Sequence, residues 1–453
     1  MATDAATDAA ASGPPSGLRN NRNWHKLLLA QGVSLIGDYV FDVTVLLWVA
    51  TVIAAHRPWA PVAASGVLIA AAIPVLAVAP IAGVFVDRWD RRRTMRLADL
   101  VRAAVIALLL LVPTVGKHWP IAVQLTMIYA CVLIASVASQ FFNPSRFAII
   151  AAAIAKEDRP RAFGISGATA NTAAVIGPPL AAPLLFSLGV DWALLINVAS
   201  FLVSYACMTA IKLPAAERKP AKERQPFWRE FWEGLSFFGH NKQLIVLCGT
   251  VVIYTLGVGA INALDVFFVK NNLHTSANWL GTLNAGLGIG SIIGALIGAK
   301  LAGWFTEARV FSYGVIATGL LILVYSRLGA LPPAIAIFAL AGIPLAAVSV
   351  VIGPIMLRVT PANLIGRVAT VMNPLVYLAS IISMAVAGVL ASSVLRNLHV
   401  VIAGVTFGRI DTIFGFSALL MAAAGLLSIR PLRESTKAQE LAPTQEQASA
   451  ATS

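Results

Sequence analysis

Two acidic residues, Asp38 and Asp42, lie four positions apart within an otherwise apolar stretch. On an α-helix this spacing places both side chains on one face. A carboxylate is costly to bury in an apolar environment, so the pair is a candidate site for taking up a proton or binding a cation. Gln31 and Trp48 lie on the same stretch and are included in this candidate site. The alternative is a structural role, in which each acid bonds to a neighbouring helix.

A third acid, Asp265, lies in a later apolar stretch, with Asn262 one helical turn before it. Its position corresponds to that of Asp38 and Asp42 in the first half of the chain, so we assign it to the same proton-coupling or substrate-cavity site. It also lies near the end of its stretch, where a carboxylate can reach water, and a structural role is therefore its main alternative.

A basic segment, Gly83 to Arg93, follows the second apolar stretch. A glycine allows close helix approach, an aspartate can cap or pair at a helix end, and arginines form charge-assisted hydrogen bonds. Such a segment can hold one end of a helix bundle closed, as an inner gate. Asp99 is expected to pair with Arg88 or Arg92, with a simple interfacial ion pair as the alternative. The residues assigned to this gate are Gly83, Asp87, Arg88, Arg91, Arg92, Arg93, Asp99 and Arg102.

A Gly-Pro pair, Gly177-Pro178, interrupts another apolar stretch and is surrounded by alanines. Proline removes a helical hydrogen bond and bends the helix, whereas small residues permit tight packing. The pair can therefore act as a pivot. A purely structural kink is the alternative.

The composition places these motifs in a membrane. Charged residues make up 12% of the chain and hydrophobic residues 58%, with a mean hydropathy of +0.81. Apolar stretches of about 20 residues, long enough to cross a bilayer, recur along nearly the whole chain. The net charge of +13 is spread over the loops, so no nucleic-acid partner is expected. The three cysteines lie in apolar stretches without ligand spacing, and no metal or cofactor site is predicted.

Twelve spans in two sets of six are predicted. We expect a disordered cytoplasmic tail at 1–22, an N-terminal six-helix bundle at 23–212, a cytoplasmic linker with an amphipathic helix at 213–243, a C-terminal six-helix bundle at 244–430 and a disordered cytoplasmic tail at 431–453. The spans are placed at 27–54, 61–86, 95–115, 120–141, 163–188, 192–211, 244–269, 279–304, 310–328, 332–357, 368–395 and 412–429.

The basic residues orient the chain. With the N-terminus inside, 27 of the 33 Lys and Arg residues fall on the cytoplasmic side. This asymmetry predicts that both termini are cytoplasmic.

The segment Gly83 to Arg93 resembles motif A of the major facilitator superfamily, and Gly177-Pro178 resembles the antiporter motif of that family. The resemblance implies an all-α membrane protein of 12 transmembrane helices, arranged as two pseudo-symmetric six-helix bundles. The fourth span departs from many proton-driven exporters because Ser136, Ser139 and Gln140 stand where those proteins carry an embedded arginine and Gln-Gly. The overall pattern is similar to the bacterial branch of drug, macrolide and siderophore exporters, which implies the inner membrane.

The resemblance implies a secondary transporter and no enzyme. The leading hypothesis is proton-coupled efflux of amphipathic, drug-like molecules by alternating access, with the small-molecule substrate, protons and the lipid bilayer as partners and a monomer as the working unit. Uptake or flipping of a lipid-like solute is the alternative within transport. A non-transporting membrane receptor is a further alternative, although the sequence contains no P-loop or nucleophile elbow.

Overall fold

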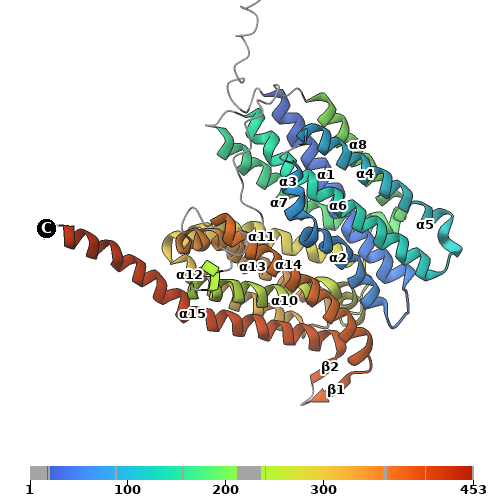
Figure 1. Cartoon of the computed structure of the whole chain (residues 1–453). Helices are drawn as coiled ribbons and strands as arrows, with labels where there is room; N and C mark the ends of the chain where they lie inside the picture. The colour runs from blue at the N-terminus through green and yellow to red at the C-terminus, as the bar shows by residue number, and fades with distance from the viewer. Residues whose placement is uncertain are drawn as a thin grey trace, which may run out of the picture. The chain divides into compact units, whose positions relative to one another are not determined.

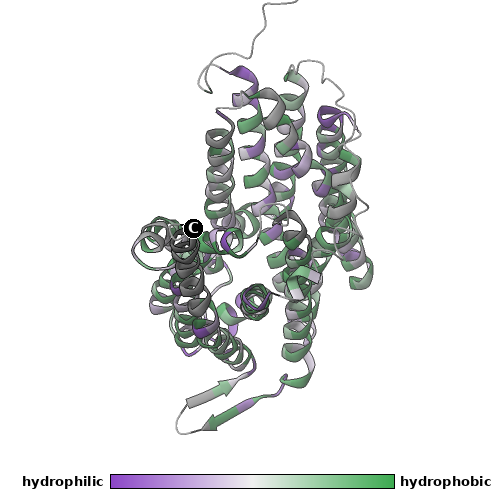
Figure 2. Cartoon of the chain, turned by 60° about the vertical axis from the view of Figure 1, so that its left-hand side comes forward, coloured by the Kyte–Doolittle hydropathy of each residue, from purple (hydrophilic) through white to green (hydrophobic). Residues whose placement is uncertain are grey.

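The computed structural model describes residues 18, 21–86, 89–154, 158–211, 236–239, 241–360, 365–402 and 405–450. Within these ranges, 12 helices are long and apolar enough to cross a membrane. This confirms the predicted number of spans, and hydrophobic residues, drawn in green, recur along the helices (Figure 2). The chain divides into unit 1, residues 1–45 and 73–221, and unit 2, residues 46–72 and 222–453. Residues 46–72, which the predicted boundaries place in the first bundle, group with unit 2.

Unit 1 consists mainly of long helices (Figure 1). It contains most of α1, the last residues of α2 and all of α3 to α8. A single turn at Val78 separates α2 from α3, which together form the predicted second span. The bounds are α1 Arg22–Trp48, α2 Ala60–Ala77, α3 Ala79–Val86, α4 Arg91–Leu109, α5 Leu111–Thr114, the 3-10 helix Gly116–His118, α6 Ile121–Ala153, α7 Arg159–Pro183, the π-helix Leu184–Leu188 and α8 Val190–Ala210.

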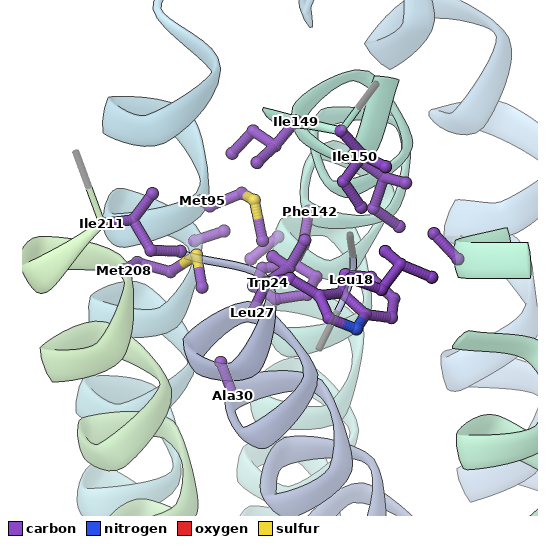
Figure 3. Packing of buried hydrophobic residues seen from close by; sticks show 14 residues of the cluster. Leu18, Trp24, Leu27, Ala30, Met95, Phe142, Ile149, Ile150, Met208 and Ile211 are labelled. Atoms are coloured by element: carbon purple, nitrogen blue, oxygen red, sulfur yellow. The ribbon is translucent and has the colours of Figure 1, made fainter. Parts of the chain in front are cut away.

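One end of unit 1 is held together by an apolar cluster (Figure 3). Trp24 and Leu27 of α1, Met95 of α4, Phe142 of α6 and Met208 of α8 are all buried there. Burying a side chain of this size contributes roughly 1.5–3 kcal/mol in water, and its close contacts also fix the relative positions of the four helices. The cluster therefore fixes α1 beside α4 and α8, which carry the polar groups described below.

Unit 2 contains the remaining helices and a β-hairpin. Its bounds are the π-helix Val49–Ile53, most of α2, α10 Lys242–Asn271, α11 Trp279–Trp304, α12 Glu307–Tyr325, α13 Leu331–Val359, α14 Ile365–Val389, the π-helix Leu390–Val394, β1 His399–Ile402, β2 Val405–Gly408 and α15 Arg409–Ala450. A short helical turn at 236–239 precedes α10, and its Phe238 packs against Leu244 and Val368.

Helices α11 and α13 approach each other closely along a stripe of glycines. A Cβ atom at Gly290 would overlap the carbonyl oxygen of Ala339, and one at Gly294 would overlap the backbone of Ile343. From the other side, a Cβ at Gly342 would overlap the carbonyl oxygen of Leu287. Small residues of this kind allow helix backbones to pack against each other within a membrane.

The hairpin is an element that the sequence analysis missed. Strands β1 and β2 pair antiparallel, with His399 opposite Gly408 and Ile402 opposite Val405. Figure 1 shows them at the end of unit 2 where α15 begins. The β-branched residues on both sides of a two-residue connection favour this hairpin, a signal that the search for long apolar stretches passes over.

Two predicted segments differ from or fall outside the structure. Helix α15 continues to Ala450, through the tail predicted as disordered from residue 431. The Ala, Glu, Gln and Lys residues of that tail have high helix propensity. The predicted amphipathic helix of the linker is carried by Phe227, Phe231, Leu235 and Phe238. The first three lie outside the described residues, and Phe238 lies in the helical turn at 236–239.

Candidate functional site

Helix α1 carries all of the residues predicted for the proton-coupling site except Asp265, and it packs tightly against two other helices of unit 1. A Cβ at Gly37 would lie 2.7 Å from Asn197 Oδ1 of α8. On the α7 side, a Cβ at Gly177 would lie 2.5 Å from the Cβ of Tyr39. The glycines therefore allow the close approach that fixes the position of Asp38, between Gly37 and Tyr39.

Gln31 forms a reciprocal contact with α7. Its Nε2 donates to the carbonyl oxygen of Ser166 at 2.8 Å, and its Oε1 accepts from the Ser166 hydroxyl at 2.7 Å. Both side chains are buried. The amide thus joins α1 to α7, which is a structural function that the sequence analysis did not anticipate.

Arg102 of α4 connects two carboxylates in unit 1. Its Nη2 lies 2.5 Å from Oδ1 of Asp99, and its Nη1 lies 3.4 Å from Oδ2 of Asp38. The other oxygen of Asp99 accepts a hydrogen bond from the hydroxyl of Ser204 on α8 at 2.6 Å. Asp99 is fully buried, whereas the Asp38 side chain is 31% exposed. The arginine is therefore held firmly by Asp99 and weakly by Asp38.

Two aromatic rings fix the Arg102 guanidinium. Its Cζ lies 4.6 Å from the ring centroid of Phe142 on α6 and 4.2 Å from that of Phe201 on α8. Cation–π contacts stabilise a cation that has lost its hydration, and they orient the guanidinium toward the acids. Ser204, Phe142 and Phe201 are site residues that the sequence analysis missed, because aromatic and hydroxyl side chains are common in apolar helices.

The charges of Arg102, Asp38 and Asp99 do not balance. One guanidinium faces the carboxylates of Asp38 and Asp99, so the three groups carry a net negative charge when all are ionised. Asp42, one turn further along α1, is exposed and has no hydrogen bond or ion pair among the described residues. The arrangement can accept a positive charge, such as a proton, at Asp38 or Asp42.

The predicted inner gate is described in part. Asp87 and Arg88 lie outside the described residues, and Gly83 lies within α3. Arg92 does not pair with Asp99. Its guanidinium instead donates to the carbonyl oxygens of Met208, at 2.8 Å, and Thr209, at the C-terminal end of α8.

A helix cap at the start of α4 organises the basic segment. Oδ1 of Asp90 accepts from the backbone N–H of Arg93 at 2.6 Å and so caps the helix. Arg91 and Arg93 follow in the first turn, where Arg93 is exposed and Arg91 is partly exposed. The ring of Trp89 stacks on Phe141 of α6 at 5.9 Å between centroids. Among the described residues, Asp90 thus caps α4, a role that the sequence analysis did not assign.

The Gly177-Pro178 pair lies in the C-terminal half of α7. Pro178, Pro179 and Pro183 are all inside this helix, and its last turn continues as the π-helix Leu184–Leu188. Each proline lacks the N–H that would bond to the carbonyl four residues earlier, so this half of α7 has fewer internal hydrogen bonds than a regular helix. Whether the helix pivots here stays a prediction.

Asp265 lies in unit 2, in a different environment from Asp38. Its Oδ1 accepts a hydrogen bond from the hydroxyl of Tyr325 on α12 at 2.7 Å, and both residues are buried. Tyr325 packs against Phe268 and Phe338 with centroid distances of 4.7 and 4.8 Å. Trp48, also buried, lies at the end of α1 in the segment that groups with unit 2. Asp265 and Trp48 thus belong to unit 2, whereas Asp38, Asp99 and Arg102 belong to unit 1.

Comparisons with known proteins agree with this architecture. The family model described as the Major Facilitator Superfamily matches residues 27–384. The transporter YkuC of Bacillus subtilis, itself uncharacterised, is 24% identical over 83% of this chain and 87% of its own length. The multidrug efflux pump Tap of Mycolicibacterium fortuitum is 25% identical over 73% of this chain and 81% of its own. The macrolide efflux protein A of Streptococcus pyogenes is 22% identical over 61% of this chain and 66% of its own length.

A solved structure supports the fold. A bacterial homologue of the iron transporter ferroportin matches 91% of this chain and 98% of its own, with a TM-score of 0.68 and 15% sequence identity. Twelve apolar helices, the transporter fold and the family match over most of the sequence lead to one assignment. The chain is a multi-pass membrane protein that belongs to the Major Facilitator Superfamily.

Proposed function

We propose that this chain is a proton-coupled efflux transporter of amphipathic, drug-like molecules. The direction of transport is inferred from the relatives, which include a macrolide efflux protein and a multidrug efflux pump. In this proposal the protein is a monomer in the bacterial inner membrane. Both termini are in the cytoplasm, since 27 of its 33 Lys and Arg residues then lie on the cytoplasmic side.

The observation that carries the coupling proposal is the unequal sharing of Arg102. Asp99 holds the guanidinium at 2.5 Å, and Asp38 contacts it at 3.4 Å. Protonation of Asp38 would remove this weaker contact while the Arg102–Asp99 pair persists. Asp42 is exposed one turn further on and offers a second carboxylate on the same helix face.

Coupling follows from a change in charge on α1. In our proposal, a proton that enters at Asp38 or Asp42 neutralises the excess negative charge and favours one of two conformations of the transporter. A membrane potential supplies about 2.3 kcal/mol per charge per 100 mV, so one or two inward protons can support considerable outward accumulation of substrate.

The proposal is tested with purified full-length protein in liposomes under an imposed pH gradient. The flux of a labelled macrolide and of a fluorescent lipophilic cation is measured for the wild type, Asp38→Asn, Asp42→Asn and the double variant. Asp158→Asn, which changes an acid at the start of α7 outside the predicted span, serves as the matched control. Gradient-driven flux should fall by at least tenfold in the double variant and remain in the control.

The same experiment separates the alternatives. Unchanged gradient-driven flux in the double variant would exclude both acids from coupling. Accumulation of the same compounds in cells that express the protein distinguishes export from uptake by its sign. Transport of a fluorescent phospholipid in the liposomes, without transport of the drugs, would instead support flipping of a lipid-like solute.

A further inference from the structure

A polar cavity opens at the end of unit 2 where the β-hairpin joins α15. Its volume is about 860 Å³, and its walls come from the end of α10, the α12–α13 connection, the segment before β1 and the first turn of α15. The lining residues include Arg327, Arg396, Arg409, His274, His399 and Asp411. Three arginines thus face a single acid among the lining residues.

One oxygen of the cavity's acid, Oδ2 of Asp411, is engaged, whereas its Oδ1 is buried without a hydrogen-bond partner among the described residues. Oδ2 of Asp411 accepts from the backbone N–H of Gly408 at 3.0 Å and lies 3.4 Å from Nη1 of Arg327. The guanidinium of Arg327 also lies 4.3 Å from the ring centroid of Phe407 on β2. Asp411 and Arg327 therefore fix the hairpin against α15, and their charges compensate each other.

The two remaining arginines have no such compensation. In the part of the chain that the structure describes, the side chains of Arg396 and Arg409 form no ion pair. Arg396 is exposed and Arg409 is half-buried. The amide side chains of Asn271, Asn272 and Asn397 add hydrogen-bond donors to the same walls. The cavity therefore combines two uncompensated guanidinium groups with neutral donors.

We propose that this cavity binds an anion of the phosphate class, held chiefly by Arg396 and Arg409. A guanidinium donates two parallel hydrogen bonds to phosphate oxygens. Two guanidinium groups at one cavity can therefore bind different oxygens of the same phosphate group. The phosphate of an anionic lipid and free phosphate share this chemistry. The site is separate from the Asp38 group and does not depend on the proposed transport function.

The test measures binding to the purified full-length protein in neutral detergent at fixed ionic strength. The thermal unfolding midpoint is followed while short-chain phosphatidylglycerol, phosphatidylcholine or inorganic phosphate is added. Wild-type protein should be stabilised by phosphatidylglycerol or inorganic phosphate and not by phosphatidylcholine. Stabilisation by phosphatidylglycerol alone identifies a lipid headgroup, and stabilisation by inorganic phosphate identifies a free anion.

Variants assign the effect to the cavity. Arg396→Gln/Arg409→Gln should raise the apparent dissociation constant at least about tenfold, the effect of losing a charge-assisted hydrogen bond. Lys270→Gln is the matched control, because Lys270 precedes Asn271 on α10 and is not among the lining residues. If the double variant is unfolded, Arg396→Lys/Arg409→Lys keeps the charge and should still weaken binding. An equal response in wild type and the folded double variant, or no anion response in wild type, would overturn the proposal.

Discussion

Arg102 of α4 reaches Asp38 of α1 across 64 residues of sequence, with 3.4 Å between Nη1 and Oδ2. The contact is long for a charge-assisted hydrogen bond, and the same guanidinium lies 2.5 Å from Asp99. The pairing joins the helix that carries the candidate proton site to the helix that begins in the basic segment.

The Arg102–Asp99 pair should contribute more to the free energy of unfolding than the Arg102–Asp38 contact does. Replacing Arg102 by methionine keeps an unbranched apolar stem but removes the guanidinium, and it leaves the fully buried Asp99 with Ser204 as its remaining partner. Breaking a buried pair in this way costs about 3–5 kcal/mol. We expect Arg102→Met to lower the thermal unfolding midpoint in detergent far more than Asp38→Asn, because Asp38 is partly exposed.

A double variant provides the control for this prediction. Adding Asp99→Leu to Arg102→Met removes the carboxylate that would otherwise be buried without a counter-charge, and should recover part of the lost stability. Equal midpoints for Arg102→Met and Asp38→Asn would show that the guanidinium is not held more firmly by Asp99.

The spans were predictable from sequence because each depends on a local property. A stretch of about 20 apolar residues can cross a bilayer wherever it lies in the chain, and the 12 predicted spans match the 12 helices found. The hairpin His399–Gly408 was missed because its strands are only four residues long. Its signal is a run of β-branched residues on each side of a two-residue connection.

The candidate site was predictable only in part. The four-residue spacing of Asp38 and Asp42 follows from helix geometry, so their placement on one helix face needed no tertiary information. The pairing of Asp99 with Ser204 joins residues 105 positions apart, and sequence periodicity does not select one hydroxyl among many. The expected pairing of Asp99 with Arg92 is not formed, because Arg92 bonds to α8 and Asp99 pairs with Arg102, one turn away on the same helix; Arg88 lies outside the described residues.

The close approach of α1 and α7 predicts a severe effect of a single methyl group. Gly177→Ala would place a Cβ 2.5 Å from the Cβ of Tyr39, so the two helices would have to separate. Overpacking of this kind costs about 1–3 kcal/mol. The thermal unfolding midpoint and the flux in liposomes should both fall in Gly177→Ala.

Gly167 on the same helix is the matched control. A Cβ at Gly167 would meet no atom within 4 Å, so Gly167→Ala should leave stability unchanged or raise it slightly. Similar losses in both variants would mean that any alanine in α7 is harmful and that the contact with Tyr39 is not the cause.

The glycine stripe of α11 gives a second pair of variants. A Cβ at Gly290 would overlap the carbonyl oxygen of Ala339, whereas one at Gly286 would lie at an ordinary contact distance of 3.4 Å from the Cβ of Ala339. Gly290→Ala should therefore reduce the yield of folded protein in size-exclusion chromatography, and Gly286→Ala should not. A normal elution profile for Gly290→Ala would argue against direct backbone contact between α11 and α13.

The bond between Tyr325 and Asp265 allows the two roles of Asp265 to be separated. Asp265 is buried, and its partner Tyr325 is fixed by packing against Phe268 and Phe338, which favours the structural alternative in which the tyrosine hydroxyl satisfies the carboxyl group. Tyr325→Phe removes that donor, and an unsatisfied buried polar group costs about 1–3 kcal/mol. Asp265→Asn retains an oxygen that can accept from Tyr325 and should be more stable than Tyr325→Phe.

Flux measurements decide between the roles. If Asp265 is structural, Asp265→Asn should show proton-driven flux within about twofold of wild type in liposomes, because its hydrogen bond with Tyr325 is kept. Loss of that flux in a variant with an unchanged unfolding midpoint would instead assign a proton to Asp265. Coupling would then involve one acid in unit 2 as well as Asp38 and Asp42 in unit 1, and a single substitution at either place would reduce the number of protons moved per substrate.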